Sequence, residues 1–156
     1  MSTFTAEELN AMVAAPMNVG MAVAMVDMGI VSTAIEAAAM TKQIAGAAKK
    51  YPNNAIIQSA FSNEALKQTK LDKPDIKADD IESGVFVDHA IADATQVIAM
   101  LEGKATAADV NEYKQFIYDC GDAVAKAAGS GLLGTGAKVS AAEANTLAKL
   151  KAALDL

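Results

Sequence analysis

The longest apolar stretch of the chain lies between residues 11 and 31, and it predicts a buried helix. Within residues 16–28 the only polar side chains are those of Asn18 and Asp27. Methionines recur on one helical face of this segment and valines on another. A helix that is apolar all round is buried. We therefore expect the segment 16–28 to be the central helix of the fold, with the other helices packed around it.

Capping motifs and apolar residues at helical spacing predict the remaining elements. Thr5 and Glu8 have the spacing of a capping box, which begins a first helix over about 6–15. Ser140 and Glu143 have the same spacing before the last helix. Pro16 either kinks this helix or begins the next one. The polar stretch 62–80 predicts a connector with at most one helical turn. Further helices are expected over 33–50, after Asn53 or Asn54, over 79–102, from Thr106 to Gly129 and over 141–154.

Composition favours an all-α fold. Hydrophobic residues make up 53% of the 156 residues and aromatic residues only 4%. Ala, Met, Leu, Lys and Glu, which favour helices, are frequent, and β-branched residues never form a long alternating run. The length predicts a single helical domain over 1–156. We expect a compact all-α bundle of six or seven helices around a buried central helix.

The charge excludes several classes of partner. There are 13 Lys and Arg residues against 19 Asp and Glu residues, which gives a net charge of −6, and the longest basic cluster is Lys49-Lys50. Nucleic acid and anionic membrane surfaces both need a concentrated positive face, so neither is expected. The apolar run over 11–26 follows the acidic Glu7 and Glu8 and is shorter than the ~20 residues of a membrane span. The sequence predicts an acidic, cytoplasmic protein.

The glycine-rich stretch 129–136 has the spelling of a dinucleotide fingerprint, with glycines at 129, 131 and 134. That fingerprint works between a strand and a helix. Here a helix is expected before it, so we predict a helix–helix connector and no nucleotide. No P-loop lysine follows at the required position either.

Three other candidates for chemistry have ordinary structural explanations. His89 lacks the Glu-x-x-His motif of di-iron bundles, because position 86 is Phe86, and we expect a surface or half-buried histidine. The single cysteine, Cys120, lies in an apolar helical pattern typical of a buried residue. The methionines alternate with Ala and Val like core residues, which argues against copper. No catalytic residue and no cofactor is therefore predicted, and an enzyme is not the favoured class.

Asp27 and Glu36 are the candidate metal ligands. Asp27 is the only charged residue between Asn10 and Ile35, and Glu36 lies in the first turns of the following helix. A carboxylate near a helix N-terminus is stabilised by backbone N–H groups and the helix dipole, so capping is one explanation. If both carboxylates meet at the turn between the helices, they offer a divalent cation site. The sequence leaves both explanations open, with capping favoured.

Two segments of the chain resemble each other. In the first, residues 19–24 precede a glycine turn and Val31-Ser-Thr-Ala-Ile-Glu36, and in the second, residues 124–129 precede a glycine turn and Val139-Ser-Ala-Ala-Glu143. Their likeness suggests a duplicated helix–turn–helix unit.

Parts of both segments also resemble a known family. They are Ala24-Met-Val-Asp-Met-Gly-Ile-Val-Ser32 with Glu36, and Ala128-Gly129 with Val139-Ser-Ala-Ala-Glu143. The pattern is similar to that of the TerB-like (tellurite-resistance) family of all-helical bacterial proteins. The resemblance implies a helical fold and an acidic metal site at the turn, half of which this chain lacks.

Two function classes are compatible with these patterns. The first is a non-enzymatic binding or stress-associated module similar to TerB-like proteins, which binds a divalent cation if Asp27 and Glu36 act together. The second is a structural or assembly protein that self-associates or pairs with a protein partner through Ala- and Met-rich helix faces.

Overall fold

The computed structural model describes residues 4–26, 33–69, 84–129 and 139–156, and within these ranges the chain forms helices and no β-strand. The expected all-α bundle is confirmed. Its described elements are α1 (Ala6–Met25), α2 (Thr33–Lys50), α3 (Ala55–Phe61), α4 (Asn63–Gln68), α6 (Val85–Leu101), α7 (Ala107–Gly129) and α8 (Ala141–Ala153).

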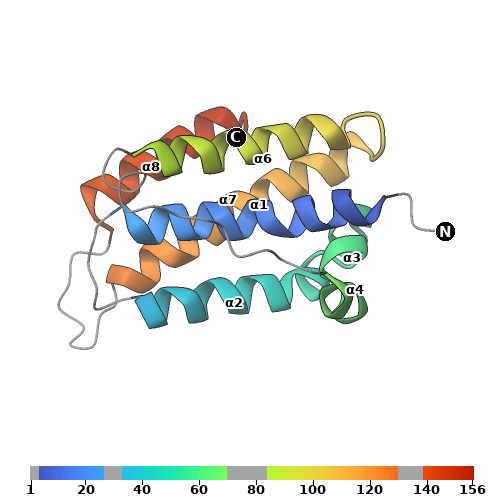
Figure 1. Ribbon diagram of the computed structural model, residues 1–156, viewed down its shortest axis with the longest axis horizontal. Coiled ribbons are helices and arrows are strands. Elements are labelled where there is room, and N and C mark those ends of the chain that lie inside the picture. Colours follow the sequence, from blue (N-terminus) through green and yellow to red (C-terminus); the bar gives the residue numbers. More distant parts are fainter. Residues whose placement is uncertain (1–3, 27–32, 70–83, 130–138) are drawn as a thin grey trace.

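Helix α1 lies at the centre of the bundle, as the sequence predicts. It crosses the middle of the molecule with α6 and α8 on one side, α2 on the other and α7 behind it (Figure 1). It packs against all of these helices and also against α3. Its core residues Met12, Val13, Val19 and Val23 are all buried. The valines face the core, whereas Met17 and its neighbours on the methionine face are only half-buried.

Pro16 lies inside α1, so of the two alternatives left open at the proline, separate helices over 6–15 and 16–28 are wrong and one helix runs through it. The helix continues through the proline and ends at Met25. A proline has no N–H to donate to the carbonyl four residues earlier, which here belongs to Met12. The hydroxyl of Tyr113 on α7 donates to this carbonyl instead, at 2.6 Å. A hydrogen bond from another helix thus replaces the one that the proline removes.

The capping boxes at the starts of α1 and α8 are confirmed. The N–H of Glu8 donates to the Thr5 hydroxyl at 3.2 Å, and the N–H of Thr5 donates to the Glu8 carboxylate at 2.9 Å. Ser140 and Glu143 form the same reciprocal pair at 3.1 and 2.8 Å. These bonds satisfy N–H groups that have no partner within the helix.

Asn54 caps α3 and joins it to the beginning of α7. Its side-chain oxygen accepts the N–H of Ile57 at 2.9 Å. Its amide nitrogen donates to the Asp109 carbonyl and to the Glu112 carboxylate, each at 2.9 Å. Although Asn54 is buried, its amide therefore has partners on both sides, as a buried polar group requires.

Two boundaries differ from the prediction. The connector expected over 62–80 contains α4, whose six residues exceed one turn at about 3.6 residues per turn. The Ser62 hydroxyl accepts the N–H of Ala65 and begins this helix. The helix expected from 79 begins at Val85, because Gly84 before it has a φ of 73°, which is not helical.

Candidate functional site

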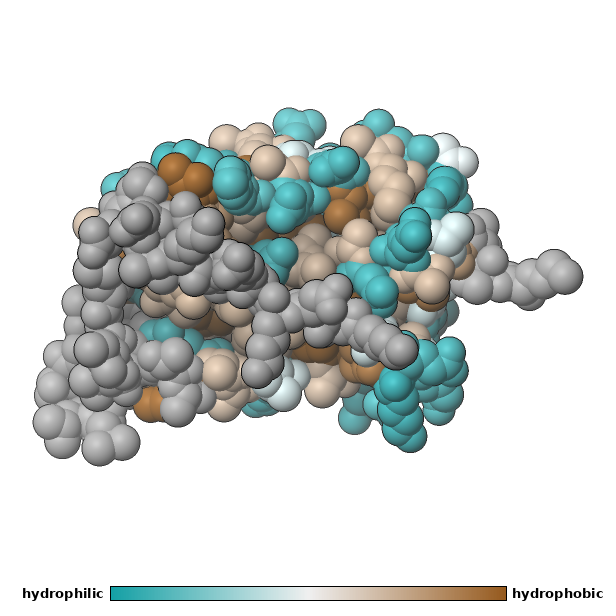
Figure 2. Space-filling view, viewed as in Figure 1, coloured by the Kyte–Doolittle hydropathy of each residue, from teal (hydrophilic) through white to brown (hydrophobic). Residues whose placement is uncertain are grey.

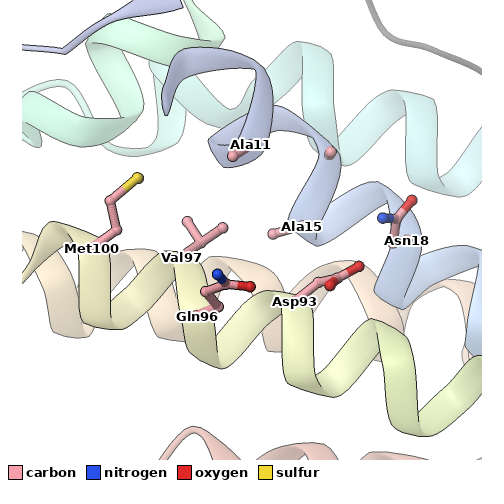
Figure 3. A pocket seen from close by; sticks show the side chains of 8 residues that line it. Ala11, Ala15, Asn18, Asp93, Gln96, Val97 and Met100 are labelled. Carbon is pink, nitrogen blue, oxygen red and sulfur yellow. The ribbon is translucent and has the colours of Figure 1, made fainter. Parts of the chain in front are cut away.

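A groove between α1 and α6 is the candidate site. The two helices run in opposite directions (Figure 1). The groove between them has a cavity volume of about 390 Å³. Side chains from both helices line it, as Figure 3 shows. They are Ala11, Ala14, Ala15 and Asn18 of α1 with Asp93, Gln96, Val97 and Met100 of α6.

The spacing of the lining residues explains why a groove forms here. On each helix they recur at i, i+3, i+4 and i+7, which is one helical face. On α1 this face carries three alanines, whose methyl groups are too short to fill the space in front of α6. On α6 the same face carries two polar residues and Met100. The facing side chains leave a hollow instead of interdigitating.

The two ends of the groove differ in polarity. Asn18 and Asp93 lie at one end, and Met100 lies at the other, near Ala11 (Figure 3). Asp93 is exposed, and its carboxylate forms no ion pair with any residue in the described ranges. In the space-filling view, hydrophobic residues are visible between α6 and α1, bordered by hydrophilic residues (Figure 2). The groove is thus apolar along its floor and acidic at one end.

Two lysines near the ends of α6 already contact carboxylates. Lys104, in the turn after α6, forms an ion pair with Glu8 at the beginning of α1. The hydrogen bonds that the Lys104 ammonium and the Thr5 N–H donate to Glu8 hold the pKa of its carboxyl below the usual value. Near the other end of α6, Lys149 of α8 lies 3.7 Å from Asp88.

The described residues do not test the predicted pairing of Asp27 with Glu36. Asp27 lies outside the described ranges. Glu36 is buried in the first turn of α2, 3% exposed. No group of three or more His, Cys, Asp or Glu side chains suited to a metal occurs in the part of the chain that the structure describes. Whether the two acids share a cation or only cap helices stays a prediction.

The other candidates behave as ordinary structural residues. His89 is exposed on α6, as expected of a surface histidine. Cys120 is fully buried, and burial raises the pKa of its thiol to about 12, far from the range of a reactive thiolate. The glycine-rich stretch begins at Gly129, the last residue of α7, and its other residues lie outside the described ranges.

The groove residues Asp93, Gln96 and Met100 were not predicted from the sequence. A signal was present, since Asn18 is one of two polar residues in the central apolar run. The spacing of the alanines before it also marks a face of small residues. The sequence does not predict that this face of small residues lies opposite α6.

Comparison with known proteins identifies no family for this chain. No protein-family model, no curated protein and no solved structure matches it. Among the residues described, none of the helices has both the length and the apolar character needed to cross a membrane.

Proposed function

We propose that this protein is a non-enzymatic binding module whose ligand lies in the groove between α1 and α6. The observation that supports the proposal is the groove itself. Small-molecule sites are concave, mostly apolar, roughly 300–1,000 Å³ in volume and supplied with a few polar groups that orient the ligand. The groove has a volume of about 390 Å³, an alanine-rich wall and three polar side chains. A stress-associated role, which the TerB-like resemblance implies, and a cytoplasmic location belong to the same proposal.

Assembly through exposed helix faces is the competing function, and the described surface supports it less. The large hydrophobic residues exposed in the described ranges are Ile35, Val85 and Leu156, which are 38%, 37% and 39% exposed. They come from α2, α6 and the end of the chain, and a binding surface between proteins needs such residues in one patch. Light scattering at increasing concentration tests this alternative, which predicts a mass above that of the monomer.

Filling the groove tests the proposal. Octanol is the probe, and amide chemical shifts locate where it binds. In the wild-type protein we expect octanol to shift the amides of α1 and α6 along the groove. Ala14→Leu places an isobutyl group in the hollow and should abolish these shifts. Ala99→Leu, on the exposed face of α6, is the matched control and should leave them unchanged. Absence of groove shifts in the wild-type protein would refute the proposal.

A divalent cation at Asp27 and Glu36 is a separate part of the proposed binding function. If the two carboxylates only cap helices, the melting temperature should not respond to calcium, magnesium or zinc. If they bind a cation, the metal should raise the melting temperature, because a ligand that binds only the folded state stabilises it. Such a rise, absent in both Asp27→Asn and Glu36→Gln, would establish the metal site.

A further inference from the structure

We propose that the groove binds an amphiphile with an ammonium head group, with the head beside Asp93 and the alkyl chain along α1. This inference rests on the proposed function and adds the chemical class of the ligand. It comes from the polarity of the two ends of the groove and from the charges around them.

The polar end offers oxygen atoms and a negative charge. The Asp93 carboxylate can only accept hydrogen bonds when it is ionised, and Asn18 and Gln96 each supply one further carbonyl oxygen. An ammonium group has three N–H donors and a positive charge, so its chemistry complements a carboxylate flanked by carbonyl oxygens. A carboxylate head would meet the like charge of Asp93 and is disfavoured.

No cation of the described chain occupies this position. Lys149 contacts Asp88, and Lys104 pairs with Glu8. Asp93 lies on the same helix as Asp88, but it forms no ion pair with the described residues. The net charge of −6 also attracts a cationic ligand more strongly than an anionic one.

The dimensions set the length of the apolar part. Asn18 lies seven positions after Ala11, which corresponds to about 10 Å along the helix at about 1.5 Å per residue. An extended octyl chain has a similar length. It would lie against the alanines of α1 and Val97, with its end near Met100, whose unbranched side chain adapts to different shapes.

Octylamine, octanol and octanoate form a matched set of probes, because they share the chain and differ in the head group. We expect octylamine to bind the wild-type protein about tenfold more tightly than octanoate, with octanol between them. Attraction of the ammonium and repulsion of the carboxylate are each small at an exposed site, and together they give this ratio. Asp93→Asn should reduce the ratio to about twofold. The matched control Asp88→Asn removes a carboxylate that is paired with Lys149 and does not line the groove, and it should retain the ratio.

The outcomes separate this inference from the proposed function. If all three probes shift the groove amides with equal affinity, the proposed function stands and the ammonium preference is refuted. The ammonium preference at Asp93 is also refuted if Asp93→Asn leaves the affinity ratio unchanged, or if Asp88→Asn lowers the ratio as much as Asp93→Asn does. If none of the probes binds the wild-type groove, the proposed function itself fails. Tighter binding of octylamine that depends on Asp93 alone, and that weakens with added salt, supports the inference.

Discussion

Tyr113→Phe removes a single hydroxyl group from the core and tests whether Tyr113 compensates for Pro16. The hydroxyl donates to the Met12 carbonyl, and both residues are fully buried. Without it, this carbonyl loses its donor, because the proline four residues later has no N–H. A buried polar group left without its partner costs about 1–3 kcal/mol. We expect the free energy of unfolding to fall by this amount, and the melting temperature by about 2–4 °C for each kcal/mol.

The double mutant provides a stronger test of the same compensation. Pro16→Ala restores a backbone N–H at position 16, which can donate to the Met12 carbonyl. In that background Tyr113→Phe should therefore cost less, and the difference between the two backgrounds should be about 1 kcal/mol or more. Urea unfolding of the four proteins, followed by circular dichroism, measures each free energy, provided that the slope with urea is unchanged.

A matched control makes the result interpretable. Tyr118 lies on the same helix and is half-buried. Tyr118→Phe should change the free energy of unfolding by less than about 0.5 kcal/mol. If Tyr113→Phe costs the same in both backgrounds, within about 0.5 kcal/mol, the hydroxyl does not replace the missing N–H and the reasoning is refuted.

Three further substitutions test the core and the ion pairs. Val23→Asp should unfold the protein, since a buried unpaired carboxylate costs several kcal/mol of a total of about 5–15, whereas Ala99→Asp on an exposed face should leave the circular dichroism melt unchanged. Burial raises the pKa of the Cys120 thiol from 9.0 to about 12, so this thiol should react with a thiol reagent only after unfolding. The free energy of unfolding should also fall as the pH rises above about 9, and it should fall less in Cys120→Ala. Lys104 and the Thr5 N–H lower the pKa of Glu8, so the stability they contribute is present above pH 4.5 and is lost as the pH falls through the lowered pKa. Lys104→Gln should lose less stability over this pH range than the wild-type protein, and parallel curves of stability against pH would contradict the prediction.

Local signals predicted the helix starts, and a distant contact explains the main error in the fold. Thr5 with Glu8 and Ser140 with Glu143 form their bonds within four residues, so their spacing alone was enough to place the caps. Pro16 was predicted to end or kink a helix, because its local effect is unfavourable. Tyr113, which offsets that effect, is 101 residues away in the sequence. The sequence contains both residues but not the contact between them.

The candidate site was less predictable than the fold for a related reason. The alanines on α1 belong to the predicted buried segment, whereas the sequence pattern did not place Asp93 in a site. A groove is a property of two faces, and it requires both the pairing of α1 with α6 and the match of Asn18 to Asp93 along them. Periodicity identifies each face separately, but it does not state which faces meet.

The unequal burial of the helices has a consequence for hydrogen exchange. Helix α4 has no buried residue, whereas α7 packs against α1, α2, α3, α6 and α8 and carries a fully buried Tyr113, Phe116 and Ile117. Opening α4 exposes little apolar surface, so its amides can exchange through a local fluctuation that leaves the rest of the bundle intact. Opening α7 breaks its packing against five other helices at once. Its amides should therefore exchange only when the whole molecule unfolds, and their exchange rates would report the global stability of the protein.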